Sequence, residues 1–235
     1  MRPKLTALTA LALTLGVAAL AHAGPVPVAV YSFQTAGDVA AFQKQAGAKC
    51  QKKWAKQKQM AITLGAKTNA CAFRTSVVGD STDPGSDMEV SAAASVGGKI
   101  SGKLMKKAYV GVAARSSETA GYELRVRPAA QTWQLFRDPR GAAGPTLFRS
   151  GKRKFIKSGA KPTALRLRAF DFGSTTTTQI TGSVNGKTVI SFADSEPDQP
   201  DGRRSVVTTG VKGTGAGTGV VGIFDNVAIK VPNPF

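Results

Sequence analysis

Histidine is almost missing from this sequence of 235 residues, which contains only His22. Beyond that position the chain has no imidazole, which excludes Ser-His-Asp and Cys-His hydrolases and histidine-containing zinc sites. Cysteine is also scarce: Cys50 and Cys71 are the only two, too few for a Cys-rich metal cluster. Carboxylates, Lys, Tyr and Arg are therefore the side chains left for acid–base chemistry.

Long apolar runs are missing too, except for one near the N-terminus. Residues 5–20 are rich in Ala, Leu and Thr and follow the basic segment 1–4. This run has the length of a signal-peptide core and is short for a membrane span. Ala21-His22-Ala23 offers small residues for cleavage, so we predict a signal peptide over 1–23; the alternative is an uncleaved anchor. The protein is expected to be bacterial and secreted, extracellular or cell-wall associated, with no integral membrane segment after cleavage.

Acidic residues are few, with 14 Asp and Glu against 32 Lys and Arg, and the formal charge is +18. Arg2 and Lys4 leave with the signal peptide, which lowers the charge to +16. Such a basic surface attracts polyanions without specificity, although a merely solubilising surface is the competing interpretation. Export and the absence of a reader motif argue against nucleic acid. The basic residues form three groups: Lys49, Lys52, Lys53, Lys56 and Lys58; Lys99, Lys103, Lys106 and Lys107; Lys152, Arg153, Lys154, Lys157 and Lys161.

The two cysteines would enter an oxidising compartment. An even pair in an exported chain predicts a disulfide between Cys50 and Cys71, with two free thiols as the alternative. Closing a loop of roughly 20 residues would stabilise the fold by about 3 kcal/mol in the chain-entropy model.

Gly, Pro, Asn and Asp interrupt the mature chain, 24–235, at short intervals, and the segments between them alternate apolar and polar residues. This pattern predicts one all-β domain with two packed antiparallel sheets. One short helix is predicted over 38–43, capped by Asp38. Asn185-Gly186 predicts a tight two-residue hairpin. Strands are predicted over 28–33, 60–64, 72–77, 88–96, 109–115, 121–126, 132–137, 165–170, 176–184, 188–190, 219–224 and 227–231.

Short motifs recur along nearly all of 28–231 in a familiar order: Phe33, DMEV at 87–90, GVAAR at 111–115, GYEL at 121–124, WQL at 133–135, LRL at 165–167, VNG at 184–186, Asp194 and GVVGIFDNV at 219–227. Their order resembles the concanavalin A-like lectin/glucanase superfamily, in its laminin-G-like, 3-keto-disaccharide hydrolase-like branch. The resemblance implies a two-sheet antiparallel jelly-roll sandwich whose concave face binds or cleaves sugars. Fold alone does not fix function.

Carboxylates decide between binding and cleavage, because glycoside hydrolases need two of them flanking the bond. Laminarinase-type enzymes of the superfamily carry a Glu-x-Asp-x-x-Glu strand motif. The nearest candidate here is Asp87-x-Glu89, whose third carboxylate is missing. A solvated strand pair is the preferred interpretation, and Glu118, Glu123 and Asp171 stand alone. No catalytic residue is assigned.

Two places could hold a structural calcium ion, although no cofactor is expected otherwise. Asp225, beside Asn226, is one, and turn geometry explains that pair equally well. The other is a loop with four carboxylates, whose prolines and irregular spacing favour a solvated acidic loop. That loop contains Asp194, Glu196, Asp198 and Asp201.

Three residues are candidates for ligand binding. Arg115 shares a strand face with the small residues Gly111 and Ala113, so it is assigned to the concave face; the alternative is an inward Arg paired with a carboxylate. Tyr122 and Trp133 fit core positions better than exposed sugar-binding ones, and offer an apolar face to a sugar ring only if exposed.

These observations favour a secreted, non-catalytic, lectin-like carbohydrate-binding or cell-surface-associated domain. We expect it to be a monomer and to bind an extracellular or cell-wall glycan that is anionic. The alternative is a secreted glycoside hydrolase or 3-keto-disaccharide hydrolase-like enzyme.

Overall fold

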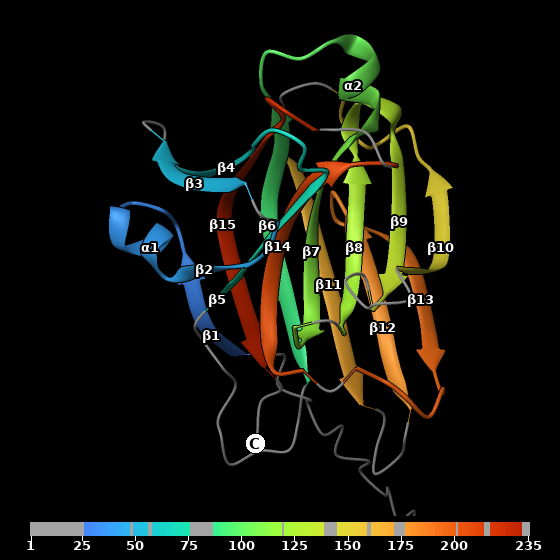
Figure 1. Ribbon diagram of the computed structural model, residues 1–235. Coiled ribbons are helices and arrows are strands. Elements are labelled where there is room, and N and C mark those ends of the chain that lie inside the picture. Colours follow the sequence, from blue (N-terminus) through green and yellow to red (C-terminus); the bar gives the residue numbers. More distant parts are fainter. Residues whose placement is uncertain are drawn as a thin grey trace, which may run out of the picture.

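The computed structural model describes residues 26–47, 49–55, 58–75, 87–118, 120–138, 145–158, 161–171, 177–200, 202–213 and 217–231. Within them, antiparallel strands form two sheets that pack face to face (Figure 1). The predicted all-β jelly-roll sandwich is confirmed. The signal peptide predicted over 1–23 lies outside the described residues and stays a prediction. No helix in the described part of the chain is long and apolar enough to cross a membrane.

One sheet contains eight strands. In spatial order they are β13-β12-β11-β6-β15-β4-β3, and β1 also pairs with β15. Their bounds are β1 Val26–Tyr31, β3 Cys50–Ala55, β4 Gln59–Leu64, β6 Met88–Gly97, β11 Thr163–Asp171, β12 Thr178–Val184, β13 Lys187–Asp194 and β15 Val221–Val231.

The other sheet contains seven strands, in the order β10-β9-β8-β7-β14-β5-β2. Their bounds are β2 Phe42–Ala46, β5 Ala70–Thr75, β7 Ala108–Ser116, β8 Tyr122–Arg127, β9 Thr132–Arg137, β10 Thr146–Lys152 and β14 Arg204–Val211. The described residues also include three short helical segments: α1 Ala36–Ala40, α2 Gly102–Lys107 and the 3-10 turn Pro128–Ala130.

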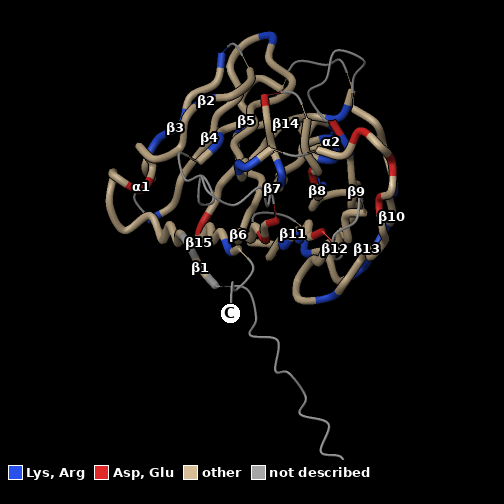
Figure 2. The backbone as a smooth tube through the Cα atoms, turned by 90° about the horizontal axis from the view of Figure 1, so that it is seen from below, with Lys and Arg blue, Asp and Glu red and all other residues tan. Residues whose placement is uncertain are grey.

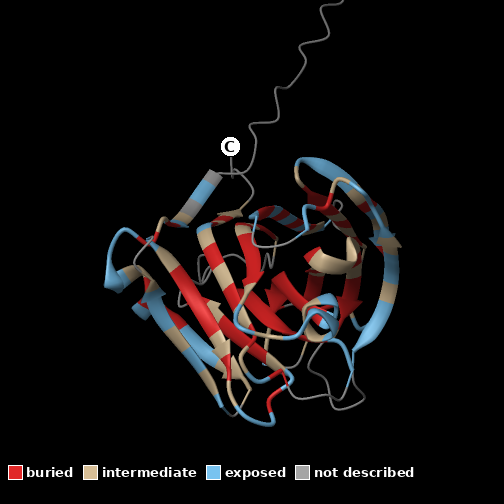
Figure 3. Ribbon diagram, turned by 90° about the horizontal axis from the view of Figure 1, so that it is seen from above, coloured by how far each residue is buried: buried red, intermediate tan, exposed pale blue. Residues whose placement is uncertain are grey.

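Strict alternation along β11 shows how the sequence builds the core. Leu165, Leu167 and Ala169 are buried between the sheets, whereas Arg166 and Arg168 are exposed on the outer face. Side chains of a strand point alternately to its two faces, so one apolar residue in two suffices to fill the space between the layers. Figure 3 shows the buried residues gathered between the layers and the exposed ones around the rim.

The predicted disulfide is confirmed, and it joins the two sheets. Cys50 starts β3 in the eight-stranded sheet, and Cys71 lies on β5 in the seven-stranded sheet. Their Cα atoms are 5.9 Å apart. The bond therefore links the two layers directly.

The predicted hairpin is confirmed as well. Asn185 and Gly186 join β12 to β13 with φ angles of 50° and 76°. The Asn185 side chain accepts a hydrogen bond from the Ala164 amide at 2.9 Å and donates one to the Phe155 carbonyl at 2.8 Å. Asn185 thus ties the turn to two neighbouring segments.

Replacing Gly186 with Val should lower the free energy of unfolding by more than about 1 kcal/mol, because a β-branched residue is strained at positive φ. A Cβ atom at this position would meet no other atom within 4 Å, so crowding does not contribute. Gly186→Asn is the matched control, since Asn tolerates this conformation and should lose much less. Urea denaturation measures both variants; equal stability of all three proteins would contradict the assignment.

The predicted helix over 38–43 is only partly right. The helix α1 begins earlier, with Thr35 at the N-cap position, and ends at Ala40. Asp38 is not the cap but lies in the first turn, where its carboxylate accepts a hydrogen bond from the Gln34 amide at 3.1 Å. Phe42 belongs to β2 because its fully buried ring packs against two other aromatic rings in the core, at centroid distances of 4.9 and 5.8 Å.

The two strands predicted over 219–224 and 227–231 form one strand, β15. Its pairing with β6 shifts register between Asp225 and Ala228. Asn226 has a φ of 49° at this bulge, and its amide donates to the Asp225 carboxylate at 2.8 Å. Turn-like geometry therefore accounts for the Asp-Asn pair.

Candidate functional site

Arg115 lies at the end of β7 and points between the sheets. The strand bulges here: Ser116 pairs with Arg204 and Ala113 with Val206, which leaves Ala114 and Arg115 opposite a single residue of β14. A bulge of this kind re-aims a side chain. Arg115 is almost completely buried and so fits the alternative of an inward, paired arginine.

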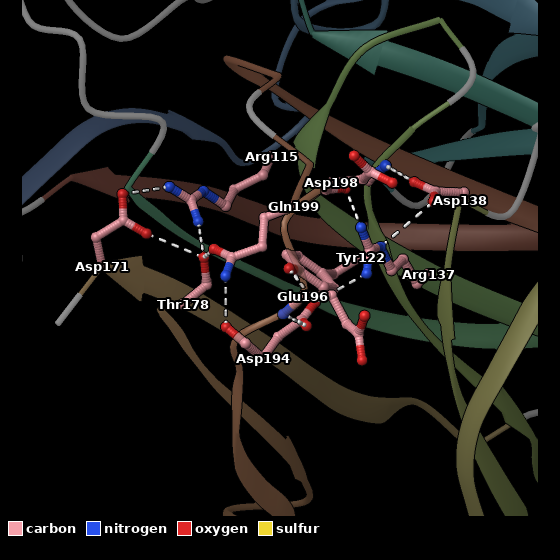
Figure 4. Close-up of polar contacts among 11 residues, drawn as sticks. Arg115, Tyr122, Arg137, Asp138, Asp171, Thr178, Asp194, Glu196, Asp198 and Gln199 are labelled. Atoms are coloured by element: carbon pink, nitrogen blue, oxygen red, sulfur yellow. Dashed lines mark hydrogen bonds and ion pairs between the residues drawn. The ribbon is translucent and has the colours of Figure 1, made fainter. Parts of the chain in front are cut away.

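The partners of Arg115 come from the opposite sheet. Its Nη2 donates to Asp171 at 2.6 Å and lies 3.6 Å from Asp87, and its Nη1 donates to the Thr178 hydroxyl (Figure 4). Gln199 also contacts Thr178, and its amide nitrogen donates to the Asp194 carbonyl at 2.6 Å. The guanidinium thus cross-links the two layers.

Tyr122 belongs to the adjoining part of the same network. Its hydroxyl donates to Asp194 at 2.6 Å, and burial together with this bond raises the pKa of the phenol. Arg137 lies 3.7 Å from the same carboxylate, donates to the Asp198 carbonyl and lies 3.4 Å from Asp138 (Figure 4). This network occupies Arg115, Tyr122 and Asp194 in holding strands and a loop together.

The two aromatic candidates do not meet the condition attached to them. Tyr122 is fully buried and Trp133 is 4% exposed, so both occupy core positions. Neither ring presents an apolar face to a sugar in this structure. Among the described residues, the large exposed aromatic side chain is instead Trp54, at 47% exposure on β3.

The two carboxylates Asp87 and Glu89 each contact a different basic residue and share none. Asp87 approaches Arg115 and accepts a hydrogen bond from the Asp171 amide at 2.7 Å. Glu89 is buried and lies 3.6 Å from Lys230. The two carboxylates therefore belong to different polar contacts.

Asp194, the calcium candidate in the acidic loop, already uses both carboxylate oxygens. One accepts from Tyr122, and the other accepts from the Glu196 amide at 3.1 Å. Calcium would have to displace these donors near the positive charge of Arg137. Among the described residues, which leave out Asp201, no group of three His, Cys, Asp or Glu side chains is arranged to hold a metal ion. Calcium at Asp194 or Asp225 stays a prediction.

A groove on the outer face of the seven-stranded sheet is the better candidate site. It has a volume of about 530 Å³ and runs beside β7, β8 and β9. A smaller hollow adjoins it, since the two share Ala70, Tyr109 and Arg125. Residues with polar or aromatic side chains in the larger groove are Asn69, Tyr109, Arg125, Gln134, Phe136 and Lys212, and Leu147 adds an exposed apolar wall.

Arg125 is the centre of the groove. Its guanidinium lies over the rings of Tyr109 and Phe136, 4.6 and 4.3 Å from their centroids. Two hydrogen bonds, of 2.7 and 2.9 Å, join it to the carboxylate of Glu123, which also accepts one from Thr208 at 2.5 Å. Burial alone would lower the pKa of Arg125, but the charges of Glu123 and Tyr109 and the hydrogen bond to Glu123 together outweigh it and raise the pKa.

Two glycines make room for this arrangement. A Cβ atom at Gly111 would lie 2.6 Å from the Thr208 hydroxyl and 3.2 Å from Glu123. A Cβ atom at Gly210 would lie 2.6 Å from the ring of Tyr109. Gly111 does leave space above the sheet, as its sequence position indicated, but residues of β8 and β14 fill that space instead of Arg115.

The groove combines an exposed apolar side chain with fixed hydrogen-bonding groups. Leu147 suits the C–H face of a polyol, while Gln134, Asn69 and the guanidinium offer polar partners. The rings of Tyr109 and Phe136 are buried and hold the guanidinium in place. Glu123 is the one carboxylate among the described residues that line the groove and its adjoining hollow. Glycosidic cleavage needs two carboxylates some 5–10 Å apart, and the described lining residues provide one.

This site was not predicted from the sequence, although the sequence pattern indicates one part of it, the pair on β8. Alternation along β8 places Glu123 and Arg125 two residues apart on the outer face of the sheet, away from the core between the layers. Charged neighbours on one face of an otherwise buried strand indicate a pair. The partners Tyr109, Phe136 and Thr208 come from three other strands, so their approach depends on strand order.

The fold is that of known sugar-binding and sugar-cleaving proteins. The structure is similar to an endo-1,3-beta-glucanase from Streptomyces sioyaensis, with a TM-score of 0.60, 11% identity and coverage of 89% of this chain and 97% of the other. A Bacillus subtilis protein of unknown function with a galectin-like fold has a TM-score of 0.59 and 10% identity, and the match covers 88% of this chain and 97% of the other. The carbohydrate-binding module CBM66 of Bacillus subtilis has a TM-score of 0.52 and 12% identity, with coverage of 81% of this chain and 95% of the other. The sequence matches no protein-family profile and no curated protein.

Proposed function

We propose that this chain is an exported carbohydrate-binding domain that holds an extracellular, anionic glycan in the groove beside Tyr109, Arg125 and Phe136. The observation that carries the proposal is the guanidinium of Arg125, fixed between two aromatic rings on the outer face of the sheet. Similarity of fold to CBM66 supports a carbohydrate partner, and the disulfide supports an oxidising, extracellular location.

Binding without cleavage follows from the state of Glu123. Its carboxylate is fully buried and already accepts hydrogen bonds from Arg125 and Thr208. A general acid or nucleophile must reach the glycosidic bond, which this carboxylate cannot do without breaking its ion pair. The groove is therefore better suited to holding a sugar than to hydrolysing it.

The anionic character of the ligand rests on charge. Lys and Arg positions are spread over both sheets and outnumber the acidic ones (Figure 2). This field draws polyanions towards the surface, and salt screens that part of the attraction. Contacts inside the groove are shorter in range and persist at high salt.

Truncating two side chains that line the groove, Leu147 and Gln134, should weaken glycan binding. A glycan array on the mature domain, with and without calcium, identifies the ligand. Leu147→Ala together with Gln134→Ala should then raise its dissociation constant about tenfold at high salt, because an apolar contact and a hydrogen bond are both lost. Isothermal titration calorimetry measures the change.

The matched control removes the same chemistry from the other sheet. Val30, on β1, is 60% exposed, and Gln179 lies on β12. Val30→Ala with Gln179→Ala should leave the dissociation constant unchanged. An array without any bound glycan, or equal weakening by both pairs, would refute the groove as a sugar site.

A further inference from the structure

A second hollow lies at the other end of the strands that line the groove. It has a volume of about 370 Å³ and is walled by β5, β7 and β14. Ala70 borders the groove and Arg74 borders this hollow, so the two are about 13 Å apart along β5. The lining residues are Arg74, Ser116, Ser117, Glu118, Gly202, Arg203 and Arg204, which we call the arginine pocket.

The walls of the arginine pocket are fixed by close contacts. Gly202 packs directly on the backbone of Ser116 and Ser117, where a Cβ atom would collide. From β2, the Gln45 side chain donates to the carbonyls of Ser117 and of Glu118, the latter at 3.1 Å. The loop after β7 is thereby held against the sheet, so the pocket is preformed.

The pocket is positively charged, and one of its arginines has an unused donor. Among the described residues that line it are three arginines, Arg74, Arg203 and Arg204, and one acidic residue, Glu118. The Nε atom of Arg74 is buried and has no hydrogen-bond partner among the described residues. A buried donor without an acceptor is destabilising, and an anion with two or more oxygens would supply the acceptor.

We infer that the arginine pocket binds the oxyanion group, a carboxylate or a sulfate, of the glycan held in the neighbouring groove. The glycan part of this inference rests on the proposed function, whereas the anion site does not. Guanidinium forks match the planar geometry of a carboxylate and two oxygens of a sulfate. Acidic and neutral glycans of the same backbone should therefore differ in affinity.

Inorganic sulfate tests the pocket without any sugar. Amide signals of Ser116, Ser117 and Gly202, followed by NMR in the mature protein, should shift and saturate as sulfate replaces chloride at constant ionic strength. Arg74→Gln should weaken this binding about tenfold, the usual loss for a hydrogen bond to a charged group. Shifts that never saturate, or that are the same in Arg74→Gln, would overturn the anion site.

Two further variants separate recognition from charge and from misfolding. Arg74→Lys keeps the charge but loses the fork, and should fall between the wild type and Arg74→Gln. Arg166→Gln removes a charge from the exposed face of β11 and should bind sulfate as the wild type does. If Arg166→Gln weakened sulfate binding as much as Arg74→Gln does, net charge alone would explain the effect, and the inference would be overturned.

A matched pair of neutral and uronic-acid oligosaccharides tests the link to the groove. The wild type should prefer the acidic sugar about tenfold, and Arg74→Gln should lose this preference while it still binds the neutral one. Equal binding of both sugars by the wild type would overturn the inference and leave the proposed function intact. Saturable sulfate binding without binding of either sugar would refute the proposed function and retain the anion site.

Discussion

Replacing Glu123 with Leu should lower the free energy of unfolding by about 3–5 kcal/mol, the usual loss when one partner of a buried ion pair is removed. The side chain of Arg125 is only 15% exposed, so its guanidinium would stay between two rings without its counter-charge, and Thr208 would lose its acceptor. Urea denaturation followed by far-UV circular dichroism measures the loss.

The double variant Glu123→Leu with Arg125→Leu is the decisive comparison. Removing both charges removes the desolvation cost of each, so the double variant should recover most of the lost stability. Glu123→Gln, which keeps an acceptor for Thr208 but loses the charge, should fall between the wild type and Glu123→Leu. If the double variant is no more stable than Glu123→Leu, the pair is not coupled as the contacts indicate.

Removing the disulfide by Cys50→Ala with Cys71→Ala should cost about 3 kcal/mol, because the bond closes a loop of 21 residues. The bond also joins β3 to β5 across the two sheets, and within the described part of the chain β3 has a strand partner on one side only. We therefore expect the loss to be concentrated near β3, where hydrogen exchange should become faster than on β7 or β8.

Reductant supplies the internal control for this experiment. Dithiothreitol should destabilise the wild type to the level of the double alanine variant and leave that variant unchanged. Mass spectrometry of the unreduced protein should find no thiol that can be alkylated. A wild type indifferent to reductant, once its reduction is verified, would contradict the stabilising role of the bond.

Most strands could be predicted from the sequence, but the edge strands β2, β3 and β10 and the central strand β14 could not. The alternation over 165–170 arises because one face of β11 packs on the core. Every second residue is therefore apolar, and this period of two can be recognised in the sequence. β2, β3 and β10 lie at sheet edges and carry many exposed polar or basic residues. Charge at an edge prevents pairing with other chains, and it also hides the strand from pattern reasoning.

The basic group 99–107 was interpreted as charge alone, yet it contains α2. Ser101 caps this helix by accepting a hydrogen bond from the Leu104 amide at 3.2 Å. Serine is a preferred N-cap residue, so Ser101 indicates the start of a helix. Six residues are too few to show helical periodicity, so the sequence pattern does not predict the helix itself.

The candidate site was less predictable than the fold, for a physical reason. Face assignment within one strand follows from a period of two, and it could have identified Glu123 and Arg125 as neighbours, although Glu123 was expected to stand alone. It fails at Arg115, because a bulge adds one residue and reverses the face. Tyr109 and Phe136 approach Arg125 only through strand order, which no local pattern contains.

The position of β15 has a consequence for when the protein can fold. This strand is the last one described, yet it lies inside the eight-stranded sheet, where β6 pairs along one side and β4 and β1 share the other (Figure 1). During synthesis, β1 and the β3–β4 hairpin have no place in that sheet until residues 221–231 emerge. Pairing of such distant segments is slow. For a chain exported as proposed, the delay would defer closure of the sandwich and so favour passage through a membrane before folding is complete.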